Sequence, residues 1–430
     1  MKVVIDDKIP FIRGILEPYA DVVYLPGGQI RRDHLLDADC LITRTRTRCN
    51  QELLEGTAVR FIASATIGFD HIDTLWCNKA GIRWTNSPGC NSGSVAQYIT
   101  AVLLEISERL NFSLHDKTLG IIGVGHVGSK VQRIAELMGM NVLLNDPPRS
   151  RAEGPDLFTD LKKLLSNSDI ITLHVPLNRE GQDKTYHLVD QEFIEALKPG
   201  AVLINTSRGE VVDEAELIQR LQGERKPETR DKRPETGDQR KETRDKRQET
   251  RDKRQETSDE RPETRDRDHH LSSLITIHSS LFTHHSSLIT RNLSLVIDVW
   301  ENEPHINREL LGLADLATPH IAGYSLDGKM NATRMVVQAV TTEFGLKLDS
   351  EDGLAGLRIT HQASRITLHD YIRETYDIRA DDRRLRESPE TFEEQRNQYP
   401  ERREFSAYTI DPFPEGDLGQ LLNALGFKTL

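Results

Sequence analysis

The stretch 119–139, LGIIGVGHVGSKVQRIAELMG, decides the fold class of this chain. A short apolar run, LGII, leads into the pattern GxGxxG, and a helix-like run follows it. In a strand–turn–helix unit, the first glycine permits a tight turn, the second lets a pyrophosphate approach the backbone, and the third lets helix and strand pack closely. The stretch therefore predicts a dinucleotide-binding α/β unit whose cofactor contacts are Gly123, Gly125, His126, Val127 and Gly128.

An acidic residue follows this unit at the spacing that dinucleotide binding requires. Eighteen residues after Gly128, the apolar run NVLLND ends at Asp146. A carboxylate at this position accepts hydrogen bonds from the adenosine ribose and repels a 2′-phosphate, so we expect NAD rather than NADP as the cofactor. The alternative is a glycine-rich turn with an incidental aspartate, and the combination of strand, helix and spaced acid disfavours it.

Further apolar runs end in polar residues. These runs are ITLHVP (171–176), AVLINTSRG (201–209), SLVIDVWENEP (294–304) and LATPHIAGY (316–324). Because ligands bind at the carboxyl ends of parallel strands, one sheet edge should carry Thr206, Ser207, Arg208, Asp298, Glu303 and His320. An Arg offers a planar fork to a substrate carboxylate, and a His beside a carboxylate can accept a hydroxyl proton. Singly, each has an ordinary explanation as a turn, surface or loop residue, but together they predict a catalytic site.

The first ninety residues also alternate apolar runs with polar stretches. The runs VVI (3–5), VVYL (22–25), CLIT (40–43) and FIASA (61–65) have the length of strands, and we expect helical segments between them. A longer helical pattern covers 94–109, and a second, more regular series runs from 119 to about 322. The sequence therefore predicts an α/β protein with two Rossmann-like, doubly wound parallel-sheet domains.

A low-complexity insertion, 224–292, interrupts the second series. From residue 228 it repeats in sevens, beginning ETRDKRP, without the apolar a and d positions that a coiled coil requires. No apolar side chain occurs from 224 to 268, so we expect this part to be disordered. The His pairs at 269–270 and 284–285 lie in low-complexity sequence, which does not favour a metal site.

Composition limits the partners of the chain. Its 56 Lys and Arg against 68 Asp and Glu give a net charge of −12, whereas nucleic acid or an anionic membrane requires clustered positive charge. Within 224–292, 17 basic and 15 acidic residues interleave, which disfavours a nucleic-acid-binding arm. The four Cys form no CxxC pair, the start MKVVIDDKIP becomes charged too early for a signal peptide, and no apolar run approaches the ~18 residues of a membrane span. We expect a cytoplasmic protein.

The pattern changes again after residue 345. RITLH (365–369), a helical stretch over 371–378, a charged run ending in YPERREF (399–405) and a helix-like GQLLNALGF (419–427) suggest a small α+β domain. We therefore expect a substrate-binding domain, 1–93 with 322–345, a NAD-binding domain, 94–321, and a C-terminal domain, 346–430.

Four motifs in this order resemble those of the D-isomer-specific 2-hydroxyacid dehydrogenases: GxGxxG, NTSRGEVVDE (205–214), DVWENEP (298–304) and TPHIAGY (318–324). The resemblance covers almost the whole chain except the insertion. The segments ATIGFDHID (65–73), NSPGCNSGSVAQYI (86–99), FSLHDKTLGIIGVGHVG (112–128), DPPR (146–149) and HIAGYSLDGK (320–329) are most similar to the branch that oxidises 4-phospho-D-erythronate in pyridoxal phosphate (vitamin B6) biosynthesis.

The resemblance also implies roles for individual residues. The catalytic trio would be Arg208, Glu303 and His320. The NAD contacts would include Asp146, Val175, Thr206, Ser207, Arg208, Asp298 and Gly323, and the substrate contacts would be Thr45, Thr66 and Tyr324. Thr45 stands where we expect Ser, which retains the hydroxyl. No metal is implied, and the C-terminal domain would join two chains into a homodimer.

Two other functions stay open at this point. One is a different 2-hydroxyacid dehydrogenase, such as one for 3-phosphoglycerate, and the other is a non-catalytic NAD-sensing regulator on the same fold. Gly323 and Tyr324 together with the C-terminal sequence favour the erythronate phosphate, and an intact Arg–Glu–His trio disfavours the regulator.

Overall fold

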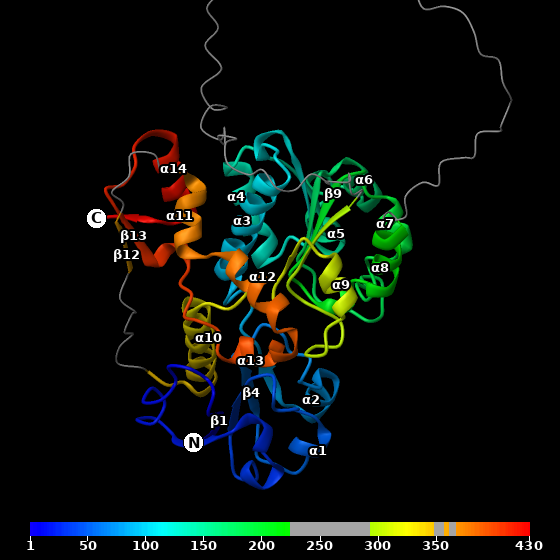
Figure 1. Ribbon diagram of the computed structural model, residues 1–430. Helices are drawn as coiled ribbons and strands as arrows, with labels where there is room; N and C mark the ends of the chain where they lie inside the picture. The colour runs from blue at the N-terminus through cyan, green and yellow to red at the C-terminus, as the bar shows by residue number, and fades with distance from the viewer. Residues whose placement is uncertain (224–292, 348–356, 361–366) are drawn as a thin grey trace, which may run out of the picture.

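The computed structural model describes residues 1–223, 293–347, 357–360 and 367–430. The insertion 224–292 lies outside the described residues, so the disorder expected for it stays a prediction. Three parallel sheets form the framework (Figure 1). None of the helices in the described part of the chain is long and apolar enough to cross a membrane.

The first sheet has the strand order β2-β1-β3-β4-β5. Its strands are β1 (Lys2–Asp6), β2 (Asp21–Leu25), β3 (Cys40–Thr43), β4 (Phe61–Ser64) and β5 (Arg83–Thr85). Successive side chains of β1 enter opposite cores: Val3 and Ile5 pack with the long helix α10 (Leu326–Phe344), whereas Val4 packs beneath α1 (Gln51–Leu54) and α2 (Thr74–Ala80). Both faces are therefore covered, as predicted for a parallel sheet.

Of the helical segments expected between the first four strands, an α-helix forms only between β3 and β4, where α1 lies. Between β1 and β2 the described chain forms turns and no helix, because Phe11 and Gly14 have positive φ angles of 60° and 86°. Between β2 and β3 only two 3-10 turns occur, at Gly27–Gln29 and Arg32–His34. The expectation of helical segments is wrong for these two connections, because a right-handed helix cannot contain left-handed residues such as Phe11 and Gly14.

The second sheet has the order β11-β10-β9-β8-β6-β7, with the strand order reversing beside β6. Its strands are β6 (Thr118–Ile122), β7 (Asn141–Asn145), β8 (Ile170–Leu173), β9 (Ala201–Asn205), β10 (Leu293–Ile297) and β11 (Leu316–Ala317). Its helices are α4 (His126–Leu137), α5 (Pro147–Glu153), α6 (Leu161–Asn167), α7 (Gln191–Glu195), α8 (Glu214–Gly223) and α9 (Arg308–Leu313). This is the doubly wound arrangement that the sequence predicts, and its ligand edge lies at the carboxyl ends of the strands.

Helix α3 (Ser92–Arg109) connects the two sheets and confirms the helix predicted over 94–109. Most of its residues are buried, because α4, α10 and the C-terminal region all pack against it. The third sheet, β12 (Leu357–Thr360), β13 (Tyr408–Asp411) and β14 (Lys428–Thr429), belongs to the C-terminal region, which also forms α11 (Leu368–Thr375), α12 (Ile378–Glu387), α13 (Phe392–Asn397) and α14 (Gly416–Leu425). The helical stretch expected over 371–378 is thus two helices, since Asp377 caps the start of α12.

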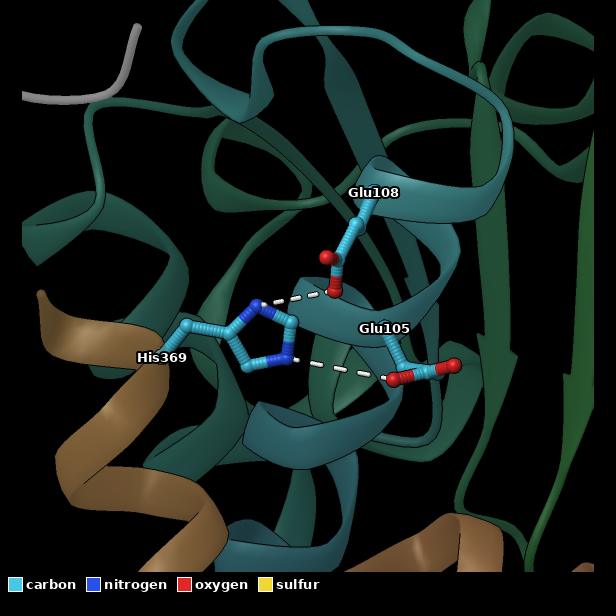
Figure 2. A group of neighbouring side chains, drawn as sticks. All are labelled: Glu105, Glu108 and His369. Atoms are coloured by element: carbon cyan, nitrogen blue, oxygen red, sulfur yellow. Dashed lines mark ion pairs between the residues drawn. The ribbon is translucent and has the colours of Figure 1, made fainter. Parts of the chain in front are cut away.

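An ion-pair network around the buried Glu105 attaches the C-terminal region to α3 (Figure 2). His369 of α11 reaches Glu108, with Nδ1 3.3 Å from Oε2, and approaches Glu105 at 3.9 Å. These three side chains have the composition of a metal site. However, three guanidinium groups also contact Glu105: those of Arg109 at 2.7 Å, Arg373 at 3.3 Å and Arg379 at 3.7 Å. The arrangement therefore favours ion pairing between α3 and α11 over metal binding.

The insertion connects the end of α8 to the start of β10, at the edge opposite the catalytic strand ends. Replacing 224–292 with a short Gly/Asn turn is therefore expected to leave kcat/KM unchanged and to raise the melting temperature. Lengthening a connection from about 4 to about 70 residues is roughly four doublings, or ~2.5 kcal/mol of closure entropy. The measurements are steady-state kinetics, thermal unfolding and trypsin digestion. In the unaltered chain, trypsin should cleave preferentially within 225–267. A tenfold loss of activity would mean that the segment contributes to the enzyme.

Candidate active site

The three glycines of GxGxxG occupy distinct environments. Gly123 has a φ of +88°, which only glycine adopts readily, and a Cβ added at Gly128 would lie 2.1 Å from the Gly123 oxygen. At Gly125, by contrast, an added Cβ meets nothing within 4 Å. Helix α4 begins at His126 without a side-chain cap, so its first backbone N–H groups point toward the same open space. This space fits the pyrophosphate of a dinucleotide.

Asp146 closes the glycine turn from the end of β7. Its Oδ2 accepts a hydrogen bond from the Val124 N–H at 2.8 Å, and its Oδ1 accepts one from the Arg149 N–H at 3.1 Å. The Arg149 guanidinium donates to the Val124 carbonyl at 2.6 Å and pairs with both oxygens of Glu153. Each Asp146 oxygen retains a second acceptor direction, which suits ribose hydroxyls.

Asp146→Ala is expected to lower the preference for NAD over NADP at least tenfold. The change removes the carboxylate that repels a 2′-phosphate and leaves the positively charged Arg149 beside the site. The measurement is the ratio of kcat/KM for the two cofactors. Asp160→Ala is the matched control, because Asp160 caps the neighbouring helix α6 in the same way. An unchanged ratio in Asp146→Ala would contradict the ribose contact.

The strand end after β8 places Val175 against the glycine turn. A Cβ added at Gly123 would lie 3.0 Å from Val175 Cγ1 and 2.6 Å from the carbonyl oxygen of His174. Burial lowers the pKa of His174 to about 3, so its ring stays neutral. That ring lies 3.0 Å from Thr172 Oγ1 and 3.5 Å from the hydroxyl of Thr206. Val175 and Thr206 thus lie on the same edge as the glycine motif, as predicted.

The loop after β9 directs Arg208 toward the first sheet. Asn205 braces this loop, because its Oδ1 accepts from the Ser207 N–H and hydroxyl while its Nδ2 donates to the Arg208 carbonyl at 2.9 Å. A Cβ added at Gly68 would lie 2.8 Å from Arg208 Nη2, so the guanidinium contacts the loop that follows β4. In that loop Thr66 donates to the Gly68 carbonyl at 2.9 Å. Arg208 and Thr66 are therefore brought together across the two sheets.

His320 and Glu303 form a hydrogen-bonded pair. His320 Nδ1 lies 2.8 Å from Oε2 and 3.0 Å from Oε1 of Glu303, which leaves Nε2 for a substrate. Burial alone would raise the pKa of Glu303, but the hydrogen bond and charge of His320, the Trp300 N–H at 3.0 Å and the charge of Arg396 together lower it. The ionised carboxylate fixes the imidazole ring and stabilises its protonated form.

Close backbone packing holds the loops that carry Arg208 and Glu303 together. A Cβ added at Gly209 would lie 2.0 Å from the Trp300 carbonyl carbon, so only glycine fits between the two loops. The three predicted catalytic residues thus come from the ends of neighbouring strands at one edge of the sheet.

Asp298 holds the loop that presents His320. Its buried carboxylate accepts hydrogen bonds from the Thr318 hydroxyl and the Ile321 N–H, each at 2.7 Å, and from the Ala322 N–H at 3.0 Å. These bonds stabilise His320 in a left-handed conformation, φ +57°, which is costly for a residue other than glycine. This positioning role for Asp298 was not predicted, and a contact between Asp298 and NAD stays a prediction.

The remaining predicted residues lie around this pair. Gly323 packs against Asn91, whose Nδ2 would be 2.1 Å from an added Cβ. The ring of Tyr324 lies near two cations, with Lys329 Nζ 5.6 Å and Arg396 Cζ 5.8 Å from its centroid. Thr45 is exposed on the loop after β3. The contacts of Gly323, Tyr324 and Thr45 with ligands stay predictions.

Sequence reasoning missed three cations near this site: Arg44, Lys329 and Arg396. Lys329 ends the quoted segment HIAGYSLDGK, and Arg44 directly precedes Thr45. Arg396 lies on α13, far away in sequence, and no local pattern connects it to Glu303.

Comparisons with known proteins agree with this site. The NAD-binding domain of the D-isomer-specific 2-hydroxyacid dehydrogenases matches residues 101–226, and a domain of unknown function, DUF3410, matches 350–426. NAD is therefore the cofactor of this domain. Two solved structures share the fold: NAD⁺-bound 3-phosphoglycerate dehydrogenase of Entamoeba histolytica (24% identity, 80% of this chain, 95% of that chain, TM-score 0.56) and D-lactate dehydrogenase of Aquifex aeolicus in complex with NAD and lactic acid (24%, 80%, 96%, 0.54).

Relatives with higher identity span nearly the whole chain. Erythronate-4-phosphate dehydrogenase of Bacteroides fragilis is 41% identical over 417 residues, which cover 95% of this chain and 99% of the relative. The enzyme of the same name in Porphyromonas gingivalis is 38% identical (95% of each chain), and that of Klebsiella pneumoniae is 34% identical (100% of this chain, 99% of the relative). The chain therefore belongs to the erythronate-4-phosphate dehydrogenases, a branch of the D-isomer-specific 2-hydroxyacid dehydrogenase family.

Proposed function

We propose that this chain oxidises 4-phospho-D-erythronate to (R)-3-hydroxy-2-oxo-4-phosphooxybutanoate in the pathway to pyridoxal phosphate. The observation that carries the proposal is the His320–Glu303 pair, 2.8 Å apart, at the same sheet edge as the glycine turn and the Arg208 loop. This arrangement suits removal of a proton from a hydroxyl group on the carbon that gives up hydride.

Each member of the trio has one task in this proposal. His320 accepts the proton of the C2 hydroxyl through Nε2, and Glu303 stabilises the imidazolium that results. Arg208 holds the substrate carboxylate against the loop of Thr66 and stabilises negative charge on the C2 oxygen. NAD, held by the glycine turn, Asp146, Val175 and the loop of Thr206 and Ser207, supplies the hydride acceptor.

Two neighbouring cations, Arg44 and Lys329, support a phosphorylated substrate. Arg44 donates to the Lys8 carbonyl at 3.0 Å, and on α10 Thr333, one turn beyond Lys329, donates to the Pro10 carbonyl at 2.8 Å. Arg44 and Lys329 therefore both lie by the loop after β1, and burial and the charge of Arg44 lower the pKa of Lys329. Within the described residues neither cation has an ion-pair partner. A substrate phosphate would compensate both charges.

The test is NAD reduction with 4-phosphoerythronate, 3-phosphoglycerate and unphosphorylated erythronate at equal concentrations. We expect 4-phosphoerythronate to have the highest kcat/KM. Lys329→Met should raise KM for 4-phosphoerythronate about tenfold and leave the weak activity with erythronate unchanged. Arg334→Met, one turn further along α10 and exposed, is the control. Equal or better turnover of 3-phosphoglycerate would refute the proposed substrate.

We also propose that the enzyme is a cytoplasmic homodimer that pairs through residues 346–430. The C-terminal region shares a hydrophobic core with α3 and α4 of its own chain, through residues such as Tyr371, Phe405 and Ile410. Its removal would expose that core, so the full chain is the appropriate sample. Light scattering at micromolar concentration should give twice the chain mass of 48.8 kDa. A mass equal to that of one chain would refute the dimer.

A further inference from the structure

Helix α13 of the C-terminal region lies between the two α/β domains (Figure 1). Glu393 near its start forms an ion pair with Arg46, which follows β3 of the first sheet. One turn later, Arg396 points to the second domain, where its Nη1 lies 3.4 Å from Glu303 Oε2. This short helix therefore contacts both α/β domains, and in the second domain it contacts the proposed active site.

Arg396 and His320 share one carboxylate oxygen. Glu303 Oε2 lies 2.8 Å from His320 Nδ1 and 3.4 Å from Arg396 Nη1. The Arg396 side chain is 25% exposed, and its guanidinium also packs on the rings of Tyr324 and Phe392 at 5.8 and 5.9 Å. Arg396 thus contacts both the oxygen that orients the proposed catalytic imidazole and the ring of a predicted substrate contact. An ion pair that only joined the two domains would not require these two contacts.

A second arginine of the same region holds the loop that carries His320. Arg402 Nη2 donates to the carbonyls of Ile321 and Ala322, at 3.2 and 2.5 Å, directly after His320 in the chain. Both the carboxylate and the histidine loop are thus fixed by residues from 392–405, within the stretch that matches a domain of unknown function.

We infer that the C-terminal region is part of the catalytic machinery, in which Arg396 is the positioning residue for Glu303 and His320. The inference rests on the acid–base roles proposed above. Arg396 keeps Glu303 ionised and oriented, and its positive charge disfavours a second positive charge on His320. It therefore favours the neutral imidazole that can accept the substrate proton.

The charges around the pair determine the sign of the effect. Asp298 and Glu214 add negative charge, since both interact electrostatically with the pair. Burial raises the pKa of Glu214 to about 7, so its contribution is partial at neutral pH. Removing the charge of Arg396 leaves these acids uncompensated, which stabilises a positive charge on the imidazole ring of His320. The acidic limb of the pH profile must then move to higher pH.

The experiment compares Arg396→Gln with Arg396→Lys and Glu393→Gln in the full-length enzyme. For Arg396→Gln we expect kcat to fall about tenfold with KM nearly unchanged, and the acidic limb of kcat/KM to move up by about half a pH unit or more. In Arg396→Lys the acidic limb of kcat/KM should return to its wild-type pH. In Glu393→Gln, which breaks the ion pair with Arg46, the acidic limb should stay at its wild-type pH. Arg396→Met, which keeps a long unbranched side chain without the charge, replaces Arg396→Gln if the latter folds poorly.

A wild-type pH profile in a folded, charge-free Arg396 variant would overturn the inference. So would a limb that moves equally in Glu393→Gln, because Arg396 would then act only through the placement of α13. Failure of the proposed function is a different result, namely a wild-type enzyme that does not oxidise 4-phosphoerythronate.

Discussion

Replacing His320 with alanine is expected to lower kcat by about 10²–10⁴-fold, the range that a positioned general base contributes. The base acts on the substrate hydroxyl, so NADH affinity should stay within about twofold of the wild-type value. Thermal stability should fall only modestly, because Asp298 still holds the loop but Glu303 loses its hydrogen bond to His320. The measurements are steady-state turnover, fluorescence titration with NADH and thermal unfolding.

His305→Ala is the matched control for this prediction. His305 is exposed and lies two residues after Glu303, so its loss tests whether any histidine change in this loop disturbs catalysis. Glu303→Gln complements both variants, because it preserves a hydrogen-bond acceptor but removes the charge that stabilises the imidazolium. We expect an intermediate loss of kcat there. Turnover near the wild-type level in His320→Ala would remove His320 from the mechanism.

Local patterns predicted most of the fold and the catalytic edge. Short apolar runs became parallel strands, and the carboxyl ends of those in the second sheet precede Arg208, Glu303 and His320 because strand direction determines that edge. The helix over 94–109 was also predictable, since its apolar residues keep helical spacing. Where local signals conflicted, as in the turns after β1, the expected helix did not form.

The parts that could not be predicted depend on contacts between distant residues. Asp298 reads from sequence as a polar strand end, and only the loop geometry shows that its carboxylate binds the backbone of residues 321 and 322. Arg396 lies 93 residues from Glu303, in a charged stretch where many arginines pair with neighbours on the same helix. Nothing local distinguishes it from Arg384 or Arg386, whose ion-pair partners lie within α12. Only the position of Arg396 in the folded structure identifies it as a neighbour of Glu303.

The same substitution at two glycines of the GxGxxG turn is expected to fail in two different ways. A methyl group at Gly128 would lie 2.1 Å from the Gly123 carbonyl oxygen, so the helix and strand must separate. We expect Gly128→Ala to cost about 3 kcal/mol, or a melting temperature about 6–12 °C lower. A methyl group at Gly125 meets nothing, so Gly125→Ala should keep the wild-type melting temperature.

The loss in Gly125→Ala should appear in cofactor binding instead. If the open space at Gly125 holds the pyrophosphate, the methyl group displaces it from the N–H groups of α4 and costs hydrogen bonds to a charged group, about 1.5–3 kcal/mol. NADH should then bind about 10- to 100-fold more weakly. Calorimetric titration and thermal unfolding on both variants separate the two effects. Unchanged NADH affinity in Gly125→Ala would mean that the cofactor does not approach the chain at this turn, and the empty space there would need another occupant.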